Sequence, residues 1–156
     1  MIILDTNIIS ELTRQVPEPG VTSWLDSLPA EEVGTTAVTA AELLYGVARM
    51  PPGRRKTELA AAVRGLLGDE FRDRVLPFDE QCASRYADIV CGRETLGRPI
   101  GVLDAQIAAI CRTVEATLAT RNTNDFSGTG IELINPWKLD DQSPHDAATG
   151  SGPGPS

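Results

Sequence analysis

Histidine is almost absent from this chain, which has one among its 156 residues. That residue, His145, lies in a polar, glycine-rich stretch near the C-terminus. The shortage argues against catalysis by Ser-His-Asp or Cys-His groups, because both need a histidine base beside the nucleophile. It also argues against zinc sites built from histidine and cysteine. A hydrolase with this sequence would have to use carboxylates and a metal ion.

Cysteine pairs and long apolar runs are also missing. The three cysteines, Cys82, Cys91 and Cys111, form no C-x-x-C pair and occupy apolar positions of predicted helices, so we expect buried thiols in a reducing compartment. No apolar run approaches the roughly 20 residues that cross a bilayer. Asp5 interrupts the apolar N-terminus before a signal sequence can form. We therefore expect a cytoplasmic protein that does not bind a membrane.

The chain has few basic residues. It contains 14 lysines and arginines and 22 aspartates and glutamates, which gives a formal net charge of −8. Asp140, Asp141 and Asp146 contribute to this excess from the C-terminal segment. Such a charge does not attract nucleic acid by itself, so an RNA substrate would need a bridging metal and local arginines. A basic partner protein is electrostatically more natural.

The composition and the hydrophobic pattern indicate one α/β domain. Hydrophobic residues make up 41% of the chain and charged residues 23%, at a length that suits a single domain. Apolar segments predict strands at 1–5, 33–36, 75–78, 117–120 and 131–134. Amphipathic segments predict helices at 7–13, 21–28, 39–50, 54–67 and 104–114, and one more that follows an N-cap at Asp79. This alternation predicts a parallel sheet with helices on both faces.

Acidic residues recur where the predicted strands give way to helices. Asp5 ends the first strand, Glu42 lies in the first turn of the helix after the second strand, and Asp104 opens its own helix. Asn122 or Asp125 follows the strand at 117–120. Because ligands bind at the carboxyl ends of parallel strands, we expect these side chains to share one site.

Carboxylates gathered in this way favour a bound cation. Two of them about 4 Å apart repel by roughly 4 kcal/mol at an effective dielectric of about 20. Oxygen-only ligands suit Mg²⁺ or Mn²⁺. The positive helix ends near Glu42 and Asp104 predict low pKa values, which favour metal binding because a ligating carboxylate must be deprotonated.

Each acid also has an ordinary structural explanation. Asp5 and Asp104 could cap helices, and Asp125 could be a turn residue. Glu42 could complete a capping box with Thr39. These roles are the more common ones for any single acid, whereas the joint occurrence at strand ends favours a shared site.

Four motifs in this order resemble those of PIN-domain ribonucleases, in particular the VapC- and FitB-type toxins of bacterial toxin–antitoxin pairs. Any one motif is weak, but their order and separation are specific. They lie at residues 3–7, at 39–43 with Gly46, at 103–108, and at 118–126 with 130–132 and 135–137.

The resemblance implies a three-layer α/β/α fold with a five-stranded parallel sheet, in a nuclease domain at 1–138 followed by a disordered tail at 139–156. It implies that Asp5, Glu42 and Asp104 hold Mg²⁺ or Mn²⁺, so that a metal-activated water hydrolyses RNA phosphodiester bonds. Many relatives have aspartate at the position of Asn122, so either Asn122 or Asp125 is expected to complete the catalytic set.

Four neighbouring residues are expected to orient the pocket or contact substrate: Thr6, Asn7, Thr120 and Arg121. Trp137 is expected to cover the edge of the sheet, with base stacking as the alternative. The resemblance further implies an endoribonuclease toxin that forms a homodimer and is neutralised by a cognate antitoxin protein.

Two other functions remain open. The first is a non-catalytic binding or regulatory module on the same fold, with Asn122 as a lost ligand. The second is a receiver-like phosphoacceptor domain, which normally has an adjacent acid pair after its first strand and a late lysine. This chain offers only Asp5 and Lys138, which makes the second alternative the weaker one.

Overall fold

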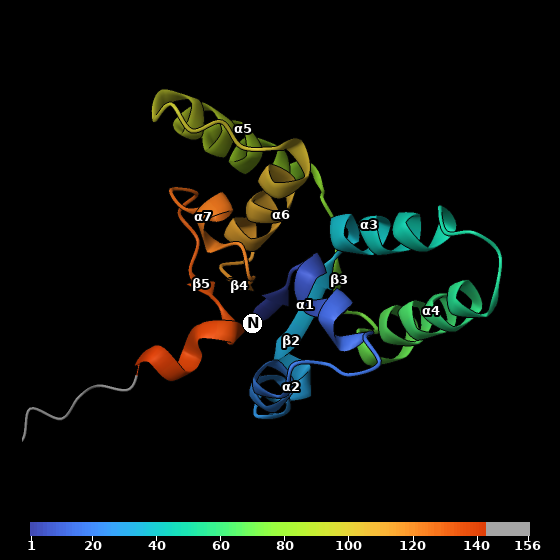
Figure 1. Ribbon diagram of the computed structural model, residues 1–156. Coiled ribbons are helices and arrows are strands. Elements are labelled where there is room, and N and C mark those ends of the chain that lie inside the picture. The colour runs from blue at the N-terminus through green and yellow to red at the C-terminus, as the bar shows by residue number, and fades with distance from the viewer. Residues whose placement is uncertain (143–156) are drawn as a thin grey trace, which may run out of the picture.

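The protein, described here by a computed structural model over residues 1–142, is built around one five-stranded sheet (Figure 1). The strand order is β3-β2-β1-β4-β5, and every pairing is parallel. The predicted parallel α/β architecture is therefore confirmed. The strands are β1 (Ile2–Leu4), β2 (Val33–Thr36), β3 (Val75–Leu76), β4 (Thr117–Ala119) and β5 (Leu133–Ile134).

Except for a short helix at Thr123–Phe126 that was not predicted, the helices follow the predicted segments with small shifts at their ends. They are α1 (Thr6–Leu12), α2 (Pro19–Asp26), α3 (Ala37–Ala48), α4 (Arg54–Gly65), α5 (Glu80–Thr95), α6 (Val102–Thr113) and α7 (Thr123–Phe126). Asp79 is the N-cap of α5, as predicted, because its side chain accepts from the amides of Gln81 and Cys82. The shorter turns are η1 (Ala30–Glu32), η2 (Leu66–Glu70) and η3 (Pro136–Gln142). The rest of the expected tail, 143–156, lies outside the described residues.

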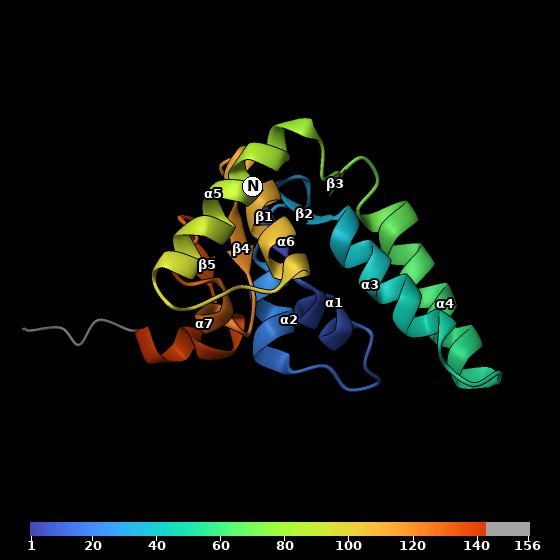
Figure 2. The same cartoon turned by 90° about the horizontal axis from the view of Figure 1, so that it is seen from above.

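The side chains of the central strands alternate between two apolar clusters, one on each face of the sheet. Ile3 and Leu118 belong to a cluster formed mainly by α5 and α6. Leu4 and Ala119, one residue further along, belong to a cluster with α1, α2 and α4. This alternation is the expected geometry of a strand buried on both faces, and it gives three layers. Figures 1 and 2 show α3 and α4 as an antiparallel pair that extends away from the sheet.

The strand order reverses between β1 and β4, which are hydrogen-bonded neighbours. From β1 the chain proceeds outward through β2 and β3, and later returns to build β4 and β5 on the other side. A crevice forms at the carboxyl ends of the two strands that flank such a reversal. Asp5, whose amide donates to the carbonyl of Ala119 at 3.0 Å, lies at this point.

The cysteines differ in part from the expectation. Cys82 and Cys111 are buried, but Cys91 is exposed, so the prediction of three buried thiols is wrong at that position. The reason is that α5 packs on α6 along one side only, and Cys91 lies on the side that faces solvent. Burial raises the pKa of Cys111 to about 12 and keeps that thiol neutral.

Within the described part of the chain, we find no helix with both the length and the apolar character needed to cross a membrane.

Candidate active site

Asp5 combines a structural role with a position in the candidate site. It is the N-cap of α1, and its Oδ1 accepts from the amide of Thr6 at 2.7 Å. Its Oδ2 accepts from the Thr120 hydroxyl at 2.7 Å and from the Asn7 side-chain amide at 3.1 Å. The capping explanation is correct for this residue and does not compete with the site, because the two oxygens have different partners.

Asn7 ties the end of β1 to the segment after β4. Its Nδ2 donates to the Thr120 hydroxyl at 3.2 Å as well as to Asp5, and its Oδ1 accepts from the amide of Arg121 at 3.0 Å. Thr120 also accepts from the amide of Asn122 at 3.1 Å. The structure thus places Asn7 and Thr120 directly around the Asp5 carboxylate.

Glu42 is not part of a capping box, contrary to the structural alternative considered above. The α3 helix begins at Ala37, and its N-cap is Thr36, which accepts from the amide of Thr39 at 3.0 Å. This earlier start places Glu42 in the second turn. Its Oε1 accepts instead from the Thr6 hydroxyl at 3.0 Å, which joins α3 to α1.

Asp104 lies in the first turn of α6 but does not cap it. The helix starts at Val102, two residues earlier than predicted, and Gly101 occupies the N-cap position without a side-chain hydrogen bond. Among the side chains described between residues 1 and 139, the Asp104 carboxylate has no hydrogen-bond partner. It is therefore the acid least fixed by its surroundings.

These residues line one pocket with a volume of about 500 Å³ at the carboxyl edge of the sheet. The pocket contains six residues from the predicted set, Asp5, Glu42 and Asp104 together with Thr6, Asn7 and Asn122. The complete lining is Asp5, Thr6, Asn7, Ser10, Glu11, Arg14, Glu42, Asp104 and Asn122. The expected convergence of acids from β1, α3 and α6 therefore occurs.

Of the two candidates for the fourth position, Asn122 lines the pocket and Asp125 does not. Asp125 lies in α7, a short helix that was not predicted, and its side chain is exposed. Its charge nevertheless raises the pKa values of Asp5 and Asp104. Asp125 is thus close enough to act on the pocket electrostatically.

A buried arginine fixes the segment that carries Asp125. Arg93 of α5 is 4% exposed, and its guanidinium donates to the carbonyls of Arg98 at 2.6 Å, Asp125 at 2.7 Å and Ser127 at 3.0 Å. Three neutral carbonyl oxygens thus accept hydrogen bonds from the buried guanidinium. These bonds connect α5 to both the loop before α6 and the end of α7.

The three candidate ligands, Asp5, Glu42 and Asp104, have raised pKa values, so the prediction of low values for Glu42 and Asp104 is wrong. Burial is the largest cause of the raised pKa for Asp5, Glu42 and Asp104. Repulsion from other acids adds to it: Asp125 acts on Asp5, Asp5 acts on Glu42, and Asp5, Asp125 and Glu42 act on Asp104. For Asp104 the result is a pKa of about 6, raised from 3.8. Desolvation and neighbouring charges outweigh the helix dipole here, because the dipole acts only at the helix end.

Glu11 and Arg14 are pocket residues that the motif analysis missed. Glu11 is buried, accepts from the amide of Glu18 at 2.8 Å, and forms an ion pair with Arg14 at 3.2 Å. The Glu18 amide is the main reason that the pKa of Glu11 is lowered. A signal was present in the sequence, because Asn7, Ser10, Glu11 and Arg14 have the spacing of one helix face.

The oxygen donors of the pocket suit a hard divalent cation, but their present arrangement does not form a coordination site. The pocket offers carboxylate, amide and hydroxyl oxygens and neither sulfur nor imidazole. Burial and repulsion from neighbouring acids raise the pKa values of Asp5, Glu42 and Asp104, and a bound cation would offset that repulsion. In the conformation described for residues 1–142, however, no three His, Cys, Asp or Glu side chains form a group that could hold a metal ion. Metal binding would require a change of side-chain conformation, and Asp104 is the acid most free to make it.

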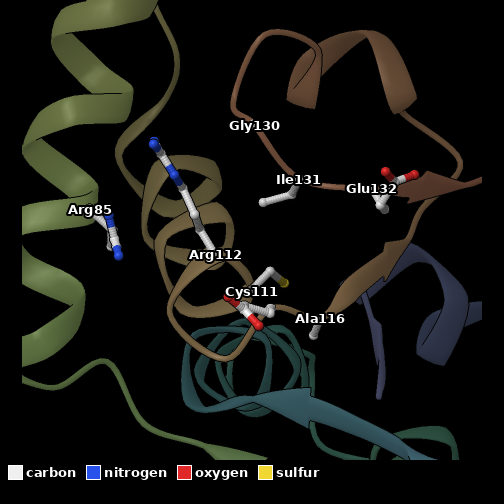
Figure 3. Close-up of a pocket in the computed structure, with 8 residues that line it drawn as sticks. Arg85, Cys111, Arg112, Ala116, Gly130, Ile131 and Glu132 are labelled. Atoms are coloured by element: carbon white, nitrogen blue, oxygen red, sulfur yellow. The ribbon is translucent and has the colours of Figure 1, made fainter.

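A second pocket of about 320 Å³ lies at the opposite edge, near the amino-terminal ends of β4 and β5 (Figure 3). It is polar, with Arg85 from α5 and Arg112 from α6, and the Arg112 guanidinium packs near Gly130. None of the predicted site residues lines it. The lining consists of Arg85, Cys111, Arg112, Glu115, Ala116, Gly130, Ile131 and Glu132.

Fold and site together define a class: a three-layer α/β/α domain with an acidic pocket at the switch point of its parallel sheet. The particular family follows from comparison with known proteins. Residues 2–131 match the model of the PIN domain, and this chain belongs to that family. The resemblance read from the four motifs is confirmed.

Curated relatives support the same assignment across most of the chain. Toxin FitB of Neisseria gonorrhoeae is 42% identical over 137 residues, which cover 88% of this chain and 99% of that protein. VapC ribonuclease Y4jK of Sinorhizobium fredii is 40% identical over 138 residues, with coverage of 88% and 99%. The crystal structure of FitAcB from Neisseria gonorrhoeae matches with a TM-score of 0.80 and 40% identity, and covers 89% of this chain and 100% of that one.

Proposed function

We propose that this protein is a divalent-metal-dependent endoribonuclease that acts as the toxin of a toxin–antitoxin pair. The proposal rests on the convergence of Asp5, Glu42 and Asp104 in one pocket of a PIN domain. Relatives of similar length carry the names ribonuclease and toxin. PIN-domain VapC nucleases depend in general on divalent metal ions, and the oxygen donors of this pocket suit Mg²⁺ or Mn²⁺.

Asp5, Asp104 and Glu42 are the residues we propose as metal ligands. When bound, such an ion supplies Lewis-acid activation of water and neutralises charge on the leaving oxygen. The protein contributes the orientation of the ligands. Thr120 and Asn7 fix Oδ2 of Asp5, while Thr6 fixes Glu42.

Asn122 is our candidate for the fourth polar group, because it lines the pocket while Asp125 does not. Its side-chain oxygen has no negative charge, so it suits the orientation of a water or a substrate group. Asp125 would act from outside the pocket through its charge. Asn122→Asp should therefore be tolerated, whereas Asp125→Asn should have a smaller effect than loss of Asp5.

A toxin active in its own cell needs a neutralising partner, so we propose a cognate antitoxin and a site of action in the cytoplasm, where RNA is available. The negative net charge of −8 favours a partner with basic contact residues. We also propose a homodimer of the domain at 1–138. Apolar side chains exposed on the contacting helices α3 and α6 offer it a surface, namely Leu44, Tyr45, Val102 and Leu103.

The test compares wild type with Asp5→Asn on total RNA in the presence of Mn²⁺. We expect defined fragments from the wild type that disappear with the substitution and with EDTA. Asp104→Asn is the structurally milder second variant, because no hydrogen bond in the described residues depends on that carboxylate. Equal fragments from all three proteins would indicate a contaminating nuclease and defeat the proposal. RNA binding without cleavage by the wild type would favour the non-catalytic alternative.

A further inference from the structure

An acidic pocket that accepts RNA must overcome repulsion from the phosphate backbone, so the free cations beside it matter. Arg14 lines the pocket but is paired with Glu11 at 3.2 Å. Arg121, at the carboxyl end of β4, forms no salt bridge with any side chain described between residues 1 and 139. Its guanidinium is thus the one of these two that remains available for an incoming anion.

The backbone of Arg121 is fixed close to the candidate ligands. Its amide donates to Oδ1 of Asn7 at 3.0 Å, and Nδ2 of the same side chain donates to Asp5 at 3.1 Å. Arg121 is therefore two hydrogen bonds away from the Asp5 carboxylate. A separate sign of proximity is electrostatic, because the charge of Arg121 helps to lower the pKa of Glu11 in the pocket wall.

Trp137 holds the side chain of Arg121. The Arg121 Cζ lies 5.0 Å from the centroid of the Trp137 ring, which is a cation–π contact. Asn135 joins the two backbones, since its Nδ2 donates to the Arg121 carbonyl at 3.3 Å and its Oδ1 accepts from the Trp137 amide at 3.0 Å. Trp137 itself is partly buried against the apolar cluster that contains Leu4 and Ala119. The indole is thus a fixed support for the guanidinium.

From this arrangement we infer that Arg121, supported by Trp137, anchors a backbone phosphate of the RNA next to the acidic pocket. The inference rests on the proposed function and adds a binding subsite to it. A guanidinium stacked on an aromatic ring keeps its N–H edge free, and that edge matches the oxygens of a phosphate. Trp137 is a positioning residue in this scheme, because the arginine covers the ring face on which a base would stack.

Binding of a labelled single-stranded RNA to the inactive Asp104→Asn protein tests the inference without turnover. We expect Arg121→Ala to weaken binding about tenfold and to reduce the slope of log K against log salt by about 0.7, the value for one phosphate contact on a single strand. Arg121→Lys should recover part of the affinity, because charge returns without the bidentate edge. Arg54→Ala is the matched control, since it removes the same charge from the exposed start of α4.

A double-mutant cycle separates the two roles proposed for the pair. We expect Trp137→Ala to weaken binding about threefold, and the double variant to bind as weakly as Arg121→Ala alone. Additive losses would mean that Trp137 contacts RNA independently and would overturn its positioning role. Thermal unfolding of each variant shows whether it is folded, and Trp137→Phe provides a milder substitution if Trp137→Ala is not.

Other outcomes distinguish this inference from the proposed function. If Arg121→Ala binds RNA as well as the Arg54→Ala control does, the phosphate anchor is refuted even when the wild type cleaves RNA. If the wild type binds RNA through Arg121 but never cleaves it with Mn²⁺, the nuclease proposal fails and the anchor stands. Absence of RNA binding by every variant would refute both.

Discussion

Replacing Asp104 by asparagine should stabilise the metal-free protein while it abolishes cleavage. The carboxylate is partly buried, lacks a hydrogen-bond partner within the described chain, and is repelled by Asp5, Asp125 and Glu42. An amide of the same shape removes the repelled charge and leaves the helix start unchanged, because Gly101 occupies the N-cap position. Stability and activity are therefore expected to change in opposite directions at this residue.

The size of the stabilisation follows from the pKa of Asp104, which is raised from 3.8 to about 6. At about 1.4 kcal/mol per unit, such a shift would cost the folded state about 3 kcal/mol if the group were fully shielded. Solvent screening at this partly exposed position reduces the value to about 1–2 kcal/mol. The melting temperature of Asp104→Asn should then exceed that of the wild type by about 3–6 °C at pH of about 7.5.

The pH dependence has a definite sign. The folded protein holds the proton of Asp104 more tightly than the unfolded chain does, since the pKa rises from 3.8 to about 6 on folding. The stabilisation by this proton is complete below the unfolded value and is lost as the pH rises through about 6. The stability advantage of Asp104→Asn over the wild type should consequently disappear as the pH falls toward about 4.

Urea unfolding in EDTA at several pH values measures both effects, with RNA cleavage in Mn²⁺ assayed in parallel. Asp88→Asn, on the exposed side of α5, is a suitable control and should change stability by less than about 0.5 kcal/mol. Addition of Mn²⁺ should stabilise the wild type and leave Asp104→Asn nearly unchanged. A variant less stable than the wild type above pH of about 7 would show that Asp104 is not repelled in the pocket, and the electrostatic reasoning would be wrong.

Three further substitutions test other parts of the structure. Arg93→Met should destabilise by at least about 2 kcal/mol in urea unfolding, because three carbonyls lose their donor, and a smaller loss would mean that water replaces the guanidinium. Gly34→Ala should cost about 1–3 kcal/mol in the same assay, since a Cβ would lie 2.7 Å from the carbonyl oxygen of Arg74; an unchanged midpoint would refute this close contact. Thr6→Val should lower the cleavage rate about tenfold by releasing Glu42, and an unaltered rate would show that this hydrogen bond does not set the ligand orientation.

Much of the sheet could be predicted from short local segments and from the alternation of strands with helices. The apolar residues of β1 mark a buried strand, and the observed bounds of β2 agree with the prediction at 33–36 although Val33-Gly34-Thr35-Thr36 carries a weak strand signal. By contrast, α7 has four residues, which is too short for a helical period, and its polar residues resemble a turn. The helix that carries Glu42 begins earlier than predicted, because Thr36 has extended backbone and caps it in place of Thr39.

The sequence predicted which acidic residues share the pocket, but not their pKa values. Asp5, Glu42 and Asp104 follow from strand ends and motif order, and the structure brings them together. Their pKa values depend on burial and on distances between segments far apart in the chain. The helix dipole alone therefore predicted lowered pKa values for Glu42 and Asp104, whereas both are raised. Glu11 was missed because it belongs to no motif, although its position on the face of α1 could have been noticed.

The hydroxyl of Thr120 gives the hydrogen bonds around Asp5 a single direction. Its one proton is committed to the Asp5 carboxylate, so its oxygen is left to accept from the backbone amide of Asn122. Hydrogen bonds aligned in one direction polarise one another. This relay runs from the Asn122 amide through the Thr120 hydroxyl to the Asp5 carboxylate, which is its final acceptor. Because the relay starts from a main-chain N–H, it is indifferent to whether residue 122 carries an amide or an acid. Exchange of that side chain therefore alters what the pocket presents to substrate while the polarity at Asp5 is preserved.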